Sequence, residues 1–205
     1  MIIFKEETRY PTITDKFFVE NGNINEVALL HRTFQELGSY ADSYQFGALL
    51  LIEKSLQEST TKDFTIYPIV FLIRHYIELR LKELIQGLSY CTTQQEELKI
   101  GHKLDTLWEE FKVAYSKIGE KIDAEVFKSI NNLIIELSNI DSTSMAYRYP
   151  IDKDGTKFEK PESINISNLK ETFIRVCFVF DGIAMQISHY VDMTEDMMMD
   201  AYNNY

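Results

Sequence analysis

The chain has 205 residues, a size typical of one domain, and it carries a net charge of −11 at neutral pH. Hydrophobic residues make up 45% of it and aromatic residues 13%, which excludes a disordered or collagen-like chain. The acidic balance disfavours broad DNA binding, because nonspecific nucleic-acid affinity comes from Lys and Arg that neutralise phosphates. A local basic cleft on an acidic body is still compatible with this composition.

The sequence contains no segment suited to a membrane crossing. Its most apolar stretch, residues 66–73, is interrupted by Pro68 and is far shorter than the ~20 apolar residues of a membrane helix. Residues 1–10 lack the basic start, apolar run and cleavage site of a signal peptide. Cys91 and Cys177 each stand alone, which is typical of a reducing compartment. We therefore expect a cytoplasmic protein that does not engage a membrane.

Apolar residues recur at the 3.6-residue period of amphipathic helices through most of the chain. Gly38 and Ser39 are the predicted stop of the first helix, whereas Pro68 and Gly87 mark the first turn and the end of the third. Five or six helices of this kind predict an all-α fold, an antiparallel bundle. The predicted helices are, in chain order, residues 27–37, 40–58, 67–86, 102–118, 121–139 and 168–192.

Two segments depart from this helical pattern. Residues 140–166 form a connection too long for a simple bundle loop, and such loops are usually functional or disordered. An alternating run and a Lys-Asp-Gly turn signal within it predict a short β-hairpin insertion at residues 146–159. Residues 193–205 are acidic and Met-rich, which predicts a flexible tail after a single helical domain over residues 1–192.

The helix predicted at residues 67–86 carries ionisable side chains along one side. With Arg74 at 0° and about 100° per residue, Glu78 falls near 40° and Lys82 near 80°. His75 falls near 100°, so four ionisable groups share one arc. One interpretation is an anion-binding pocket lined by the three cations, which Glu78 holds in place. The alternative is a solvent-exposed face with weak i,i+4 ion pairs.

Further candidate residues lie outside this helix. His102 opens the next predicted helix, where backbone N–H groups favour an anion; it is either catalytic or a capping side chain. Arg148 stands between two tyrosines, one of them Tyr149, and before Pro150, which is typical of a stacked guanidinium. An ordinary exposed loop arginine is the alternative. No HExxH, CxxC, GxxxxGK[ST] or GxGxxG motif occurs, so we expect no metal and no cofactor.

The segments PIVFLIRHYIELRLKELI and GHKLDTLW, followed by YRYPID and an Asp-Gly turn, resemble small bacterial all-α proteins of the HEPN type. The resemblance covers about residues 66–155. It implies a helical bundle, often dimeric, and in many members a metal-independent ribonuclease of toxin–antitoxin or anti-phage systems. The HEPN hallmark, an Arg followed four to six residues later by His, is absent. A site would therefore combine Arg74 and His75 with His102 and Arg148 from other segments.

Three functions follow from these observations. The first is binding of a phosphate-bearing ligand, a nucleotide or RNA, through Arg74, Glu78, Lys82, Arg148 and Tyr149. The second is a metal-independent ribonuclease, in which His75 or His102 is the acid or base and Arg74 or Arg148 stabilises phosphate charge. The third is an acidic adaptor or inhibitor that binds a basic protein partner, and a homodimer is compatible with each of them.

Overall fold

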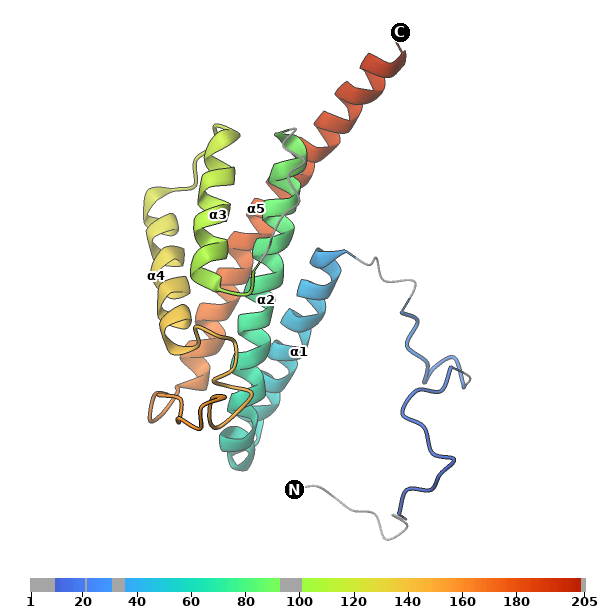
Figure 1. Cartoon of the computed structure of the whole chain (residues 1–205), viewed down its shortest axis with the longest axis vertical. Helices are drawn as coiled ribbons and strands as arrows, with labels where there is room; N and C mark the ends of the chain where they lie inside the picture. The colour runs from blue at the N-terminus through green and yellow to red at the C-terminus, as the bar shows by residue number, and fades with distance from the viewer. Residues whose placement is uncertain (1–9, 21, 31–35, 93–100, 204–205) are drawn as a thin grey trace. The chain divides into compact units, whose positions relative to one another are not determined.

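The computed structural model describes residues 10–20, 22–30, 36–92 and 101–203 of the chain (Figure 1). The chain divides into two units, residues 1–34 and residues 35–205. In the first unit, the described residues form turns and irregular stretches without a helix or strand. The second unit contains the helices and every candidate site residue.

The described part of the second unit is built from five α-helices and one short 3₁₀ helix, so the predicted all-α class is confirmed. These elements are, in chain order, α1 (Leu37–Gln57), η1 (Ser59–Thr61), α2 (Lys62–Cys91), α3 (Leu104–Lys117), α4 (Ala124–Ile140) and α5 (Ile166–Asn203).

Helix α2 is the central element, because it packs against α1, α3 and α5 (Figure 1). Helix α4 packs on α3, and α1 also contacts α5. Apolar side chains of α2 are buried on several sides of the helix, from Ile69 to Leu88. A helix that is apolar around most of its circumference requires neighbours on most sides. The polar residues of α2 therefore lie among packed helices and loops.

A cluster of ion pairs around Arg80 of α2 joins three helices. Arg80 is 5% exposed, and its guanidinium forms ion pairs with Asp42 of α1, Glu83 of α2 and Asp181 of α5. It also lies 5.5 Å from the ring centre of Tyr76. Since the partners of Arg80 come from the packed helices themselves, this cluster serves the fold.

The predicted ends of two helices are wrong. Gly38 and Ser39, the predicted stop, lie in the first turn of α1, and the described residues of the predicted helix before them, 27–30, are not helical. Residues 31–35 lie outside the described residues. At the other end of the chain, α5 continues past the predicted end near Asp192 to Asn203. Its C-terminal turns thus occupy the segment predicted as a flexible tail, because Met, Asp and Glu side chains are compatible with a helix even where no neighbour packs on it.

The two strands of the β-hairpin predicted at residues 146–159 are also absent from this described segment. The described chain there has only one isolated antiparallel bridge, between Ile151 and Lys157, around a turn at Gly155 with a φ of 82°. Ala146 and Tyr147 are adjacent and both buried. A strand would place adjacent side chains on opposite faces, so this burial does not fit a strand.

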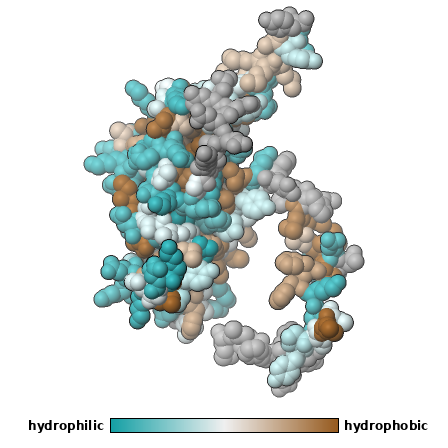
Figure 2. Space-filling view, viewed as in Figure 1, coloured by the Kyte–Doolittle hydropathy of each residue, from teal (hydrophilic) through white to brown (hydrophobic). Residues whose placement is uncertain are grey.

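Hydrophilic residues cover most of the helical unit in the view of Figure 2, interrupted by small apolar patches. Exposed apolar side chains occur on α1, where Phe46 is 68% exposed, and on α5, where Phe178 is 80% exposed. Single exposed apolar residues of this kind are normal on a soluble surface and require no special explanation.

Gly87 marks a close approach of α2 and α5. A Cβ at this position would lie 2.6 Å from Cγ2 of Ile187, a methyl group of a buried β-branched side chain. We expect Gly87→Ala to lower the free energy of unfolding by about 1–3 kcal/mol, because overpacking outweighs the gain in helix propensity. In the matched control Gly182→Ala, the new methyl meets nothing within 4 Å, so stability should rise by up to about 1 kcal/mol. Urea denaturation of both variants checks this, and equal gains would contradict the close approach.

Candidate functional site

Arg74 is fully buried and binds three different parts of the protein. Its Nε donates to the backbone oxygen of Asp141 at 3.2 Å, and its Nη1 donates to Oε2 of Glu78 at 2.9 Å. Its Nη2 donates to the backbone oxygen of His102 at 2.9 Å. The guanidinium thereby joins α2 to the residues just before α3 and just after α4. Because all three of its nitrogen atoms bind protein oxygens, the geometry favours a positioning role for Arg74.

Glu78 is the centre of this cluster and is 2% exposed. Besides Arg74, it accepts hydrogen bonds from Nζ of Lys82 and Nδ1 of His102, both at 2.8 Å. Burial acts to raise the pKa of Glu78, but the hydrogen bonds from Lys82, His102 and Arg74 outweigh it and lower that pKa. The carboxylate is therefore ionised at neutral pH. The alternative of a solvent-exposed face is wrong for Arg74 and Glu78, since neither is exposed.

His102 lies just before the N-cap residue of α3, which is Lys103. Its side chain is 78% exposed while its Nδ1 contacts the buried carboxylate of Glu78. With Glu78 ionised, Nδ1 carries the hydrogen and donates it, so the ring is oriented by the protein. An oriented and accessible imidazole of this kind can bind an anion or accept a proton from a ligand.

His75 lies between two aromatic rings, in edge contact with Tyr44 at 4.3 Å and stacked on Phe71 at 5.7 Å between ring centres. Burial is the main cause that lowers the pKa of His75. The negative charge of Glu78 acts to raise this pKa, whereas nearby cations, of which Lys82 has the largest effect, lower it further. The ring is therefore neutral at pH 7 and suited to accept a proton rather than to donate one.

This lowered pKa predicts a pH dependence of stability. Below the ordinary histidine value of 6.5 the unfolded chain binds a proton at His75 that the folded chain does not, so acidification below that pH destabilises the fold. The slope should be a fraction of the ~1.4 kcal/mol per pH unit of one full proton, because solvent screens a half-exposed ring. In His75→Phe, which keeps a ring at this position, that part of the slope should vanish in chemical denaturation between pH 7 and 5. An unchanged slope would contradict the assignment.

Arg148 lies in the connection between α4 and α5 and is exposed. Its Nε donates to the backbone oxygen of Ser144 at 2.6 Å, and its Cζ lies 5.4 Å from the ring centre of Phe71 and 6.0 Å from that of Tyr149. The predicted stacking of this guanidinium is thus observed. An arginine held by its Nε and stacked on rings keeps an accessible edge for a planar anion.

Lys160 was not identified from the sequence. Its Nζ lies 5.4 Å from the ring centre of Tyr67 and 5.9 Å from those of Tyr147 and Phe158. Among the described residues, its ammonium forms no ion pair and lies near aromatic rings instead. A half-buried ammonium without a carboxylate partner is a ready partner for an anionic ligand.

Arg148 and Lys160 line one pocket of about 270 Å³, together with four other residues. None of the described residues that line it carries a carboxylate. Burial raises the pKa of Tyr147, with smaller contributions from Asp141 and Tyr67, so its hydroxyl stays protonated. The pocket therefore combines two cations with tyrosine rings. Its lining residues are Tyr67, Tyr147, Arg148, Tyr149, Pro150 and Lys160.

The predicted site residues fall into two groups along α2. Arg148 and Tyr149 lie near Tyr67, at the start of the helix, whereas His102 lies with Glu78 and Lys82 further along it. Between them, the Arg148 guanidinium lies over the ring of Phe71, which stacks on His75. The structure thus unites Arg74, Glu78, Lys82 and His102 in one cluster and places Arg148 and Tyr149 in another, with His75 between.

Comparisons of the chain with protein-family models, curated proteins and solved structures found no match. No group of three or more His, Cys, Asp or Glu side chains suited to a metal ion occurs in the described part of the chain. Among the described helices, none has the length and apolar composition that a bilayer crossing requires.

Proposed function

We propose that the chain is a HEPN-like helical protein that binds a phosphate-bearing ligand, a nucleotide or RNA, in the pocket of Arg148 and Lys160. The observation that carries the proposal is the pairing of these two cations in a pocket without a carboxylate. A guanidinium presents a planar edge to phosphate oxygens and an ammonium adds a point charge. The tyrosine rings supply stacking surfaces for a base. The resemblance to HEPN proteins adds a setting in anti-phage defence or toxin–antitoxin stress response.

The buried cluster of Arg74 and Glu78 is linked through Asp141 to the turn that carries Arg148. Oδ1 of Asp141 accepts hydrogen bonds from the backbone N–H groups of Met145 and Ala146, at 2.8 and 3.0 Å. The backbone oxygen of the same residue is held by Arg74. The turn that carries Arg148 is therefore anchored to the ion pairs of α2, which keeps the guanidinium in place before a ligand arrives.

Loss of either cation should weaken ligand binding. We expect Arg148→Met and Lys160→Met each to weaken the binding of a nucleotide or short RNA by about tenfold or more, as for the loss of one charge-assisted contact. The matched control is Lys153→Met, since Lys153 is exposed in the neighbouring turn and lines none of the pockets described here. It removes the same charge and should change affinity by less than about twofold. Isothermal titration calorimetry measures all four proteins, and equal losses in the three variants would contradict the pocket.

A second function, a metal-independent ribonuclease, is favoured by one observation, the exposed His102 oriented by Glu78. In that reaction the imidazole accepts the proton of a ribose 2′-OH, the 2′-oxygen bonds to the phosphorus, and the bond from phosphorus to the 5′-oxygen breaks while that oxygen takes a proton from water. Cleavage of a tRNA and total-RNA mixture in the presence of EDTA, lost in His102→Ala, would support this function. No cleavage by the folded wild type would leave binding as the function.

A further inference from the structure

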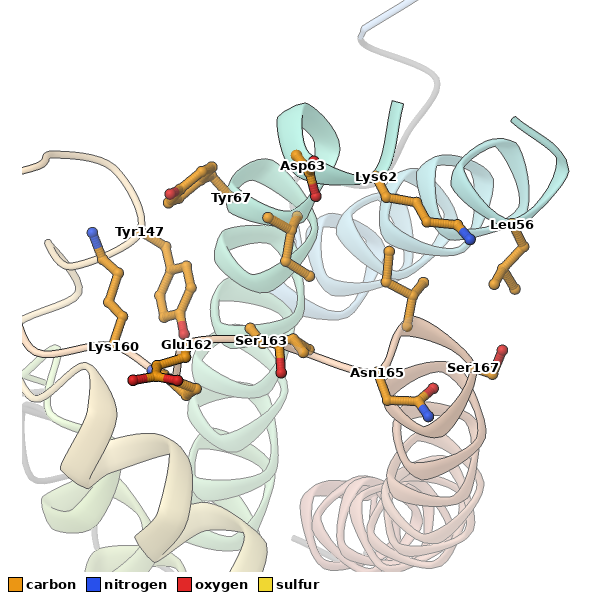
Figure 3. Close-up of a pocket in the computed structure, with 14 residues that line it drawn as sticks. Leu56, Lys62, Asp63, Tyr67, Tyr147, Lys160, Glu162, Ser163, Asn165 and Ser167 are labelled. Atoms are coloured by element: carbon orange, nitrogen blue, oxygen red, sulfur yellow. The ribbon is translucent and has the colours of Figure 1, made fainter. Parts of the chain in front are cut away.

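A larger cavity adjoins the pocket of Arg148 and Lys160. Its volume is about 570 Å³, within the range of small-ligand sites, and it shares Tyr67, Tyr147 and Lys160 with the smaller pocket (Figure 3). The end of α1, the first turns of α2 and residues 160–167 enclose it. The two cavities therefore form adjoining compartments on either side of shared residues.

The two compartments differ in their chemistry. The larger cavity is lined by two carboxylates, of Asp63 and Glu162, and by two ammonium groups, of Lys62 and the shared Lys160. Hydroxyl and amide groups of Ser163 and Asn165 complete its polar lining. In Figure 3, Asp63 stands on the first turn of α2, across the cavity from Ser163 and Asn165. Within the described residues, the Asp63 carboxylate forms neither an ion pair nor a side-chain hydrogen bond. It is an acceptor without a protein donor, on the wall of a cavity.

These differences define which end of a ligand each compartment suits. Phosphate is attracted to the two cations of the smaller pocket, whereas the larger one has as many carboxylates as cations and offers no net positive charge. Sugar hydroxyls and base amino groups, in contrast, can donate hydrogen bonds to a free carboxylate. A polynucleotide that crossed both compartments would place its next phosphate where the charges are balanced. A ligand with a single phosphate at one end needs only the cationic pocket.

We propose that the ligand of this site is a nucleoside monophosphate, with its phosphate between Arg148 and Lys160 and its sugar and base in the larger cavity beside Asp63. The inference rests on the proposed function, since it names the class of phosphate ligand. The charges agree, because a phosphate monoester carries about −1.5 to −2 at pH 7 and meets two cations. The rings of Tyr67 and Tyr147 lie where the two compartments meet.

Calorimetric titration of the full chain with inorganic phosphate, with each of AMP, GMP, CMP and UMP, and with a ten-nucleotide single-stranded RNA tests this inference. At least one monophosphate should bind about tenfold or more tightly than both inorganic phosphate and the RNA. Asp63→Asn should weaken that monophosphate by about tenfold without weakening inorganic phosphate, because only the sugar or base contacts the carboxylate. Arg148→Met should weaken both.

The possible outcomes distinguish a failure of this inference from a failure of the proposed function. Monophosphates that bind no better than inorganic phosphate or RNA, or that are indifferent to Asp63→Asn, would overturn the inference while phosphate binding itself stands. Binding of none of these probes would overturn both. Circular dichroism confirms that the variants are folded, and Asp63→Asn preserves the size of the side chain at an exposed position.

Discussion

Replacing Arg74 by alanine should lower the free energy of unfolding by about 3–5 kcal/mol, because it leaves buried partners without their cation. The guanidinium is 0% exposed, and the substitution removes hydrogen bonds to Glu78, Asp141 and His102 together. The backbone oxygen of His102 loses the donor Arg74, that of Asp141 keeps the N–H of Ser144 at 3.4 Å, and the charge of Glu78 keeps only Lys82 and the imidazole of His102. Urea denaturation of wild type and variant measures the loss.

The matched control for this substitution is Arg175→Ala. Arg175 also forms an i,i+4 pair with a glutamate, Glu171, but the two side chains are 76% and 65% exposed. Exposed pairs of this kind contribute 0–1 kcal/mol, so the control should change stability by less than about 1 kcal/mol. If Arg74→Ala were as mild as Arg175→Ala, the buried cluster would not be the anchor described above.

Replacing Asp141 by alanine should destabilise the fold and weaken ligand binding together. The carboxylate is 2% exposed, so its loss leaves the N–H groups of Met145 and Ala146 without their acceptor, at about 1–3 kcal/mol each. It also removes the charge whose Oδ2 lies 3.7 Å from Nε of Arg74. Because the same turn carries Arg148, we expect ligand affinity to fall by about tenfold in protein that is still folded.

Asp141→Asn separates the two contributions of this side chain. Asparagine keeps an acceptor oxygen for both N–H groups but loses the charge beside Arg74. Ligand affinity should therefore stay within about threefold of wild type while stability is still reduced, as titration calorimetry and urea denaturation would show. An affinity that falls equally in both variants would indicate that charge, and not the position of the turn, controls binding.

The local pattern predicts much of α2, but not the partners of its polar side chains. The i,i+4 pairs of Arg74 with Glu78 and of Glu78 with Lys82 follow from the helical period alone. The contacts of Arg74 with His102 and Asp141 do not, since those residues are 28 and 67 positions away in the chain. The sequence offers no periodic signal for such distant contacts, which depend on how the loops pack.

Lys160 illustrates the same limit in the candidate site. It lies in an irregular connection, where neither helix nor strand periodicity relates one residue to another. Its aromatic neighbours include Tyr67, on the second turn of α2, which only the fold brings close. The stacked Arg148 could be predicted, by contrast, because one of its rings, Tyr149, is its neighbour in sequence.

The start of α1 also differs from what the local pattern predicts. Glycine at position 38 is typical of a helix stop, yet Gly38 lies within the first turn of α1, against the side chain of Glu83. A Cβ at this position would meet the carboxylate end of Glu83, a flexible group that can turn away, so the packing accepts glycine here without requiring it. The position of Gly38 inside a helix thus differs from the turn that the sequence pattern predicted.

The most direct test of the account is a two-dimensional NMR titration of the ¹⁵N-labelled protein with AMP, GMP, CMP and UMP in turn, which follows the arginine Nε–H and backbone amide signals. For at least one of them the account predicts saturable shifts at Arg148 and in the amides of residues 145–149, Lys160, Glu162 and Ser163, with smaller changes near Asp63. Shifts centred on His102 and Lys82, or no saturable shift with any of the four at millimolar concentration, would contradict the assignment of the phosphate site to Arg148 and Lys160.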